Sequence, residues 1–355
     1  MMLIDEEALP ALAIGCSLLG AGGGGDTETG LLAALQAVAE YGPVQALDLD
    51  EMPDEDLIMP CGGVGSPMIG IEKIGNNESA EALRRGVEQL RGRKVAALMG
   101  SEIGGSNGLW PVVWAASMGL PITDADGMGR AFPEVPQVTM EIAGISATPG
   151  VVADERGNWL IVNAISGAWA EKIDRALAVV FGGSLEATDY ILTAKEARTA
   201  AARGTYTLAI KIGRAMLNSE DPIGALEEQV GARRLISGKI VDVEYQATDG
   251  FYRGSVLVEG LKQDAGRLVR VEIQNENLVV IEDGVVRAMV PDIITFLDSH
   301  YGKPIHTERL RYGQRVTVVG LPCDPIWRTE KGLALAGPRA FGYDIDYLPI
   351  EQVTN

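Results

Sequence analysis

The sequence is poor in histidine, cysteine and basic residues, and each shortage excludes a class of function. Only two of its 355 residues are histidine, which excludes zinc hydrolase sites built on three or four imidazole ligands. The three cysteines are sparse and odd in number, which does not fit a disulfide framework, so a reducing cytoplasm is the expected location. Lys and Arg number 30 against 49 Asp and Glu, a formal net charge of −19. Such a surface repels nucleic-acid phosphates and anionic lipid headgroups, so we expect neither nucleic acid nor membrane as a partner.

A long apolar run is also missing. The uncharged stretch 8–25 contains Pro10 and six glycines, which make it too weakly apolar to span a membrane. The first seven residues carry three acids and no Lys or Arg, whereas a secretory signal begins with a positively charged segment. We therefore expect a cytoplasmic protein without a secretory signal, whose partner is a small-molecule substrate.

Glycine, in contrast, is abundant: it makes up 44 of the 355 residues, against about 7% in average proteins. The segment 20–25 reads GAGGGG and matches G-x-G-x-x-G, but a dinucleotide site needs a strand before this loop, and here a helix is predicted. No nucleotide cofactor is therefore expected. Two interpretations stay open: a flexible turn between helices, or a loop whose amides bind a ligand beside the next helix N-terminus. On the second, Gly22, Gly23, Gly24 and Gly25 are substrate-binding residues.

The order of predicted elements indicates an α/β protein, α+β overall. Helices are predicted over 5–19 and 26–40, strands over 44–49, 57–60, 95–99 and 121–123, and a hairpin over 151–153 and 159–162. Helical patterns follow at 169–180 and 194–217, and short β-like runs begin at 240. We predict an N-terminal α/β domain (1–168) with a mostly parallel or mixed sheet. The predicted C-terminal domain (169–355) has helices over 169–235 and a mostly β barrel or sandwich-like part over 236–345.

Acidic residues follow two neighbouring strands of the predicted sheet. Glu102 comes after strand 95–99, and Asp124 and Asp126 come after the next one. Because ligands of open α/β sheets bind at the carboxyl ends of the strands, these acids are candidate catalytic groups. Asp124 and Asp126 are also the candidate ligands of a divalent metal, since paired carboxylates bind hard cations. The competing interpretation is structural: Asp124 caps a turn, Asp126 forms it with Gly127, and a nearby arginine makes an ion pair.

Other polar and small residues near these strand ends are candidates for contacting the substrate. Asn107, Arg130 and Glu134 stand in the same two segments as the acids. Gly62 and Gly63 belong to a predicted glycine-rich turn over 61–67, which Cys61 opens. Cys61 is a candidate nucleophile, although a cysteine is more often a small buried apolar residue, and no histidine stands near it in sequence to lower its pKa.

The motifs together resemble one bacterial family. They are SLLGAGGGGD (17–26), CGGVGSP (61–67), EIGG (102–105), DADGMGRAFPE (124–134) and GLP (320–322). The chain is similar over nearly its whole length to the S-methyl-thiohydantoin desulfurase family, which has N- and C-terminal domains. The resemblance implies a cytosolic protein of hydantoin catabolism, and a hydantoinase-like or oxoprolinase-like protein as partner. We also expect a homo-oligomer.

An S-methyl-thiohydantoin is a cyclic isothiourea, and its hydrolysis adds water to the carbon that bears sulfur and expels methanethiol. A hydrolase of this kind needs a base for water, stabilisation of the tetrahedral intermediate and polar contacts to the ring. Asp124, Asp126 or Glu102 is the expected base or, on a metal-dependent route, a ligand of the metal that activates water. The alternatives are a non-catalytic ligand-binding or accessory subunit of a hydantoinase-like or oxoprolinase-like system, and a metal-dependent hydrolase or isomerase of another cyclic amide.

Overall fold

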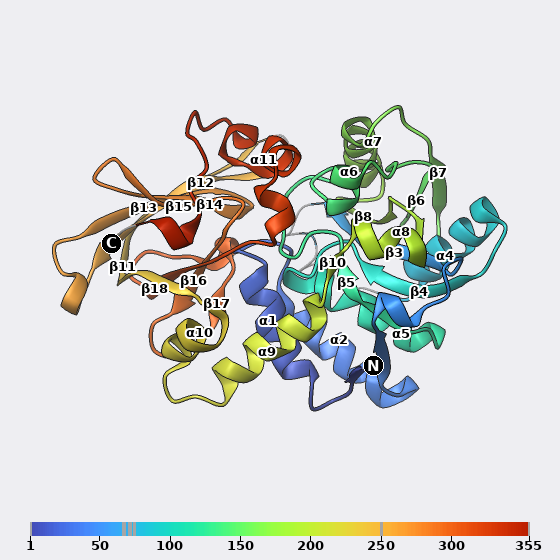
Figure 1. The fold of residues 1–355 in the computed structure, drawn as a ribbon, viewed down its shortest axis with the longest axis horizontal. Helices are drawn as coiled ribbons and strands as arrows, with labels where there is room; N and C mark the ends of the chain where they lie inside the picture. The colour runs from blue at the N-terminus through green and yellow to red at the C-terminus, as the bar shows by residue number, and fades with distance from the viewer. Residues whose placement is uncertain (1, 66–68, 70–72, 74–75, 249–250, 354–355) are drawn as a thin grey trace.

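The computed structural model describes residues 2–65, 69, 73, 76–248 and 251–353, and two sheets organise this part of the chain (Figure 1). A ten-stranded mixed sheet is formed within residues 2–203, and an eight-stranded antiparallel sheet within residues 233–321. The predicted fold class is confirmed: a mixed sheet with helices comes first, and a mostly β part follows it.

The first sheet has the order β1-β2-β5-β4-β3-β8-β6-β7, with β10 beside β5 and β9 beside β3. Its strands are β1 (Met2–Ile4), β2 (Val44–Leu47), β3 (Leu57–Gly65), β4 (Val95–Gly100), β5 (Ile122–Asp126), β6 (Gly150–Ala153), β7 (Trp159–Val162), β8 (Ser184–Thr188), β9 (Leu192–Thr193) and β10 (Ala202–Arg203). β2, β5, β4 and β3 are parallel neighbours, and β6 and β7 form the predicted hairpin. The carboxyl ends of β3, β4 and β5 therefore meet at one edge of the sheet.

Ten α-helices accompany the sheets in the described residues, and all but the last precede the second sheet in the chain (Figure 1). They are α1 (Leu9–Leu19), α2 (Thr27–Tyr41), α4 (Glu78–Arg91), α5 (Trp110–Met118), α6 (Thr139–Ala143), α7 (Gly167–Val180), α8 (Ala194–Ala200), α9 (Thr205–Leu217), α10 (Pro222–Val230) and α11 (Glu330–Ala336). The carboxylate of Asp26 caps α2 by accepting the Glu28 amide. The single helix expected over 194–217 is wrong: Ala202 and Arg203 leave it to pair with β5, which divides it into α8 and α9.

The glycine-rich turn expected over 61–67 is a second correction. β3 continues through it to Gly65 because the strand changes partners there: it runs parallel to β4 as far as Cys61 and then antiparallel to β8 from Gly62 to Gly65. Gly63 thereby lies opposite Glu186 of β8. Ser66 and Pro67 of the expected turn lie outside the described residues.

The second sheet has the order β15-β14-β13-β12-β11-β18-β16-β17, and every pair of neighbours is antiparallel. Its strands are β11 (Arg233–Thr248), β12 (Phe251–Gly260), β13 (Leu268–Gln274), β14 (Glu276–Glu282), β15 (Val285–Met289), β16 (Ile293–Asp298), β17 (Pro304–Ile305) and β18 (Arg315–Leu321). The domain boundary at residue 168 stays a prediction; the first sheet takes β8, β9 and β10 from beyond it.

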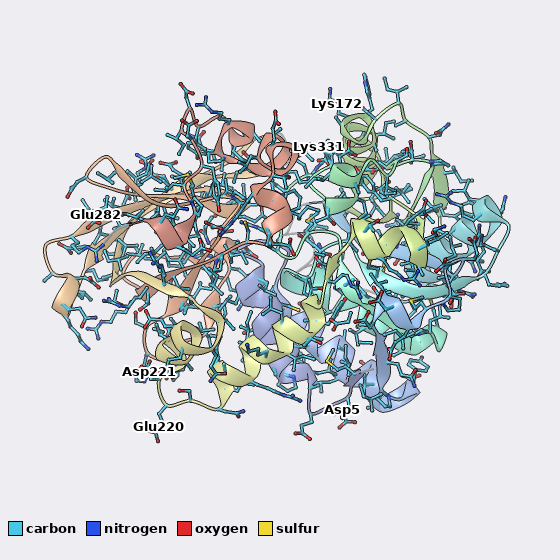
Figure 2. All side chains as sticks on the ribbon, in the orientation of Figure 1. Asp5, Lys172, Glu220, Asp221, Glu282 and Lys331 are labelled. Carbon is cyan, nitrogen blue, oxygen red and sulfur yellow. The ribbon has the colours of Figure 1, made fainter. Side chains whose placement is uncertain are left out.

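The two sheets are joined by α1 and the glycine loop that follows it. Asn277 of β14 donates its backbone N–H to the Ala21 carbonyl at 2.8 Å, and the Thr307 N–H donates to the Gly22 carbonyl at 2.9 Å. The helices α7 and α11 both lie at the top of the view in Figure 2, where Lys172 of α7 and Lys331 of α11 are labelled. Residues from both halves can therefore reach a space enclosed between them.

Candidate functional site

A cavity of about 220 Å³ opens at the carboxyl ends of β3 and β4. One wall comes from the ends of β3 and β4 and from β8, another from the segment 128–140 and α7, and a third from the glycine loop and the start of β14. Its acidic lining residues are Asp26, Glu102, Glu134, Glu171, Glu186, Asp189 and Glu276, and its basic one is Arg175. Among the described residues, the cavity is thus strongly acidic.

Glu102 lies in this cavity as the sequence predicts, and a chain of hydrogen bonds fixes its position. One carboxylate oxygen accepts the Asn107 side-chain N–H at 2.5 Å, and the other accepts the Phe132 backbone N–H at 3.3 Å. Asn107 in turn accepts the Gly63 N–H at 3.0 Å. Burial raises the pKa of Glu102 to about 8, against the lowering effect of the Asn107 hydrogen bond. Glu102 therefore holds its proton at neutral pH.

A second carboxyl group, Glu186 on β8, faces the same glycine, and the sequence analysis missed it. Gly63 pairs with Glu186 across the two strands, and a Cβ at Gly63 would lie 3.4 Å from both the Asn107 Oδ1 and the Glu186 Oε2. Burial raises the pKa of Glu186 to about 7, and the nearby Lys73 partly offsets the rise. Gly63 thus lies beside the Glu186 carboxyl group and is linked to that of Glu102 through Asn107.

The second sheet contributes Glu276, at the start of β14, which the sequence analysis also missed. It is 2% exposed, and its Oε2 has no hydrogen-bond partner among the described residues. Burial raises its pKa well above the usual range, and the charge of Glu102 adds to the rise. A Cβ at Gly23 would lie 1.9 Å from its Oε1, so only glycine leaves room for this carboxyl group.

The four predicted glycines of the first loop divide into two pairs. Gly22 and Gly23 are buried against the second sheet: a Cβ at Gly22 would lie 2.6 Å from the Thr307 Cγ2. Gly24 and Gly25 line the cavity, and Gly62 and Gly63 line it from β3. The loop therefore joins the two halves of the molecule with its first part and reaches the cavity with its second part.

Asp126 lies outside the cavity lining and organises the loop that follows β5. Its Oδ2 accepts the backbone N–H groups of Ile103, Met128 and Gly129 at 2.8, 3.0 and 2.8 Å. The side chain is 0% exposed, and burial raises its pKa to about 7. These bonds hold the chain beside Glu102 in place, which agrees with the structural interpretation of this acid.

Asp124 also lies outside the cavity lining, and its carboxylate binds the first turn of α9. It accepts the Thr207 backbone N–H at 3.0 Å and the Thr207 hydroxyl at 2.5 Å. The two aspartates thus have separate partners. Across the described ranges, no three or more His, Cys, Asp or Glu side chains gather closely enough to hold a metal ion. Within the described residues, the metal ion expected at Asp124 and Asp126 therefore has no third ligand of these residue types.

Cys61 and Arg130 occupy the interior rather than the cavity wall. The Cys61 thiol is 0% exposed and donates to the Met99 carbonyl at 3.5 Å, and burial raises its pKa above the usual range. Arg130 is 1% exposed and donates to the carbonyls of Pro291 and Asp292 at 2.6 and 2.9 Å. Burial lowers its pKa to about 10, so it stays charged and joins the halves of the molecule.

The remaining predicted residue, Glu134, lines the cavity beside α7. Burial raises its pKa, and the charge of Glu171 adds to the rise. Glu171 accepts the Val135 N–H at 2.8 Å and the Arg175 Nε–H at 2.6 Å. Of the predicted site residues, the cavity therefore brings together Glu102, Asn107, Glu134 and the glycines 24, 25, 62 and 63.

The comparisons with known proteins agree with this two-part architecture. The model of the S-Me-THD-like N-terminal domain matches residues 7–164, and that of the S-Me-THD-like C-terminal domain matches residues 165–350. A crystal structure of a protein from Chromobacterium violaceum has a TM-score of 0.83 and 22% identity, covering 99% of this chain and 100% of that chain. At that identity the likeness shows the fold alone. No curated protein matches the chain. In the described part of the chain, no helix has the length and apolar character needed to cross a membrane.

Proposed function

This chain belongs to the S-Me-THD-like family, and from that premise we propose that it hydrolyses a cyclic amidine of the hydantoin type, with water displacing methanethiol. The observation that carries the proposal is that two carboxyl groups with raised pKa values, Glu186 beside Gly63 and Glu102 linked to Gly63 through Asn107, line one cavity. The pKa of Glu186 is about 7 and that of Glu102 is about 8. Two acids of one cavity whose pKa values differ can divide the roles of base and acid between them.

In the first step, Glu186 acts as the general base. It takes a proton from a water molecule, whose oxygen forms a bond to the ring carbon that bears sulfur. Glu102 gives its proton to the adjacent ring nitrogen as the C=N bond becomes single. The result is a neutral tetrahedral intermediate that carries both a hydroxyl and a methylthio group.

In the second step, the carbon–sulfur bond breaks and the carbonyl forms. The hydroxyl of the intermediate returns a proton to Glu102, and Glu186 gives its proton to the departing sulfur, so that methanethiol leaves. Both carboxyl groups return to their starting states, and the products are the hydantoin ring and the thiol. Asn107 positions Glu102 in both steps, because it links that carboxylate to the Gly63 backbone.

The test is release of methanethiol from an S-methyl-thiohydantoin, measured with a thiol reagent on the purified protein. Glu186→Gln and Glu102→Gln should each lose roughly 10²- to 10⁴-fold in kcat, the usual contribution of a general acid or base. Glu228→Gln, which removes one exposed charge from α10, is the matched control and should keep the wild-type rate. Binding of the ring without thiol release would instead support the non-catalytic alternative, and full activity in both cavity variants would exclude these roles.

A further inference from the structure

The wall that the second sheet gives to the cavity contains an amide side chain that the proposed chemistry does not use. Asn275 lies between β13 and β14, immediately before Glu276, and lines the cavity. It is 8% exposed. Two hydrogen bonds hold its backbone: its N–H donates to the Tyr252 carbonyl at 2.8 Å, and its carbonyl accepts the Thr307 hydroxyl at 2.7 Å. These bonds fix the point from which the side chain extends.

The hydrogen bonds of the Asn275 side chain show which end of its amide is free. Its Oδ1 accepts the Tyr252 backbone N–H at 2.9 Å, and since a backbone N–H must meet an acceptor, this contact assigns the oxygen. The Nδ2 group has no hydrogen-bond partner among the described residues, and it is not one of the unpaired side-chain atoms that are fully enclosed there. Asn275 therefore brings an unused N–H donor to the cavity wall.

The backbone conformation of Asn275 does not require this donor. Its φ of 57° lies in the left-handed region, which asparagine, aspartate and glycine adopt more readily than other residues. An aspartate would accept the Tyr252 N–H in the same way, because that contact uses only a side-chain oxygen. The turn thus accounts for the backbone and for the Oδ1 of Asn275, but not for its Nδ2.

We propose that Asn275 donates its free side-chain N–H to a carbonyl oxygen of the bound ring and so selects rings that carry this carbonyl. The donor needs an acceptor, and an anionic one such as a carboxylate would be repelled, because the cavity lining holds seven acidic residues and one arginine. A neutral carbonyl oxygen meets both conditions.

A hydantoin-type ring has such a carbonyl, separated by one ring nitrogen from the carbon that bears sulfur. This carbonyl would face Asn275 on the wall of the second sheet, while the reacting carbon and its ring nitrogen face Glu186 and Glu102 on the wall of the first sheet. The inference rests on the proposed function for the identity of the ring.

The test is titration calorimetry of the intact protein at pH 7 with two neutral rings, hydantoin and 2-imidazolidinone, which is the same cyclic urea without the second carbonyl. The wild type should bind hydantoin roughly threefold to tenfold more tightly, the usual net effect of one hydrogen bond. Asn275→Asp keeps the acceptor for Tyr252 and loses the N–H, so the ratio should fall to about one or below. Asn218→Asp, which adds the same charge at the exposed C-cap of α9, should keep the wild-type ratio.

A second variant, Asn275→Gly, permits the same φ without any side-chain donor or added charge, and its ratio should also fall to about one. An unchanged ratio in both variants would overturn the inference, even if both rings bind more weakly, because a residue that only shapes the cavity weakens both alike. If neither variant folds, the wild type decides: equal binding of the two rings, or no binding of hydantoin, overturns the inference.

Thiol release from an S-methyl-thiohydantoin is measured separately. If that activity stands and the preference for hydantoin fails, only this inference is wrong; if the preference stands and thiol release fails, only the proposed function is wrong.

Discussion

The two acids of β5, Asp124 and Asp126, and the cavity acids Glu102 and Glu186 have the same side-chain chemistry and different surroundings. Asp126 has its Oδ2 filled by three backbone N–H groups, and Asp124 is held by Thr207. Glu102 and Glu186 instead line a cavity, with pKa values of about 8 and about 7. The difference is one of access: Asp124 and Asp126 lie outside the cavity lining, whereas Glu102 and Glu186 line it, and we expect only an acid that lines the cavity to exchange a proton with a ligand.

The largest stability effect in this comparison should come from Asp126→Ala. It leaves the N–H groups of Ile103, Met128 and Gly129 buried without an acceptor, and each such group costs about 1–3 kcal/mol. We expect a loss of roughly 3 kcal/mol or more in the free energy of unfolding, measured by urea denaturation. Asp126→Asn keeps one carbonyl oxygen for the three bonds and should lose much less. Equal stability of the alanine variant and the wild type would show that this acid does not hold the loop.

The pH profile of thiol release should sharpen the contrast further. Activity requires Glu186 to be ionised and Glu102 to be protonated, so kcat/KM should be highest between about 7 and about 8. It should fall about tenfold per pH unit below that window, as Glu186 gains a proton, and about tenfold per unit above it, as Glu102 loses one. In Glu186→Gln the residual activity should lose its acidic limb. A profile that is flat from pH 5 to 10 would contradict this division of roles.

The smallest effect is expected for Cys61→Ala. Cys61 belongs to β3, its buried thiol donates to the Met99 carbonyl of β4, and its pKa is raised rather than lowered, so we expect it not to act as a nucleophile. We expect thiol release within about threefold of the wild-type rate and a stability loss of about 1 kcal/mol, typical of a small core truncation. A loss of activity comparable with that of Glu186→Gln, in a protein that remains folded, would restore the thiol mechanism.

Local signals in the sequence predicted much of the fold and part of the site. The helix α2, the strands β4 and β5 and the position of Glu102 just after a strand follow from patterns within a few residues. Glu186 and Glu276 could not be found in this way, because they reach the cavity through contacts distant in sequence. Glu186 depends on the pairing of β8 with a strand that begins more than a hundred residues earlier, and no local signal marks it.

The sequence alone did not show what the glycine run at 20–25 packs against. A run of glycines predicts close backbone approach, but not whether the neighbour is a ligand or another part of the chain. At Gly23 the neighbour is the Glu276 side chain, and at Gly24 it is the Gly104 carbonyl. The glycine loop therefore both joins the two sheets and lines part of the cavity.

The most direct measurement compares Glu186→Gln with Asp124→Asn, with the rate of methanethiol release and the thermal unfolding of each variant measured side by side. The account predicts that Glu186→Gln loses roughly 10²- to 10⁴-fold in kcat with an almost unchanged melting temperature. Asp124→Asn should keep its rate within about twofold and lose about 1 kcal/mol of stability through the weakened first turn of α9. The reverse pattern, with activity lost in Asp124→Asn and retained in Glu186→Gln, would contradict the central claim that the cavity carboxyl groups carry the chemistry.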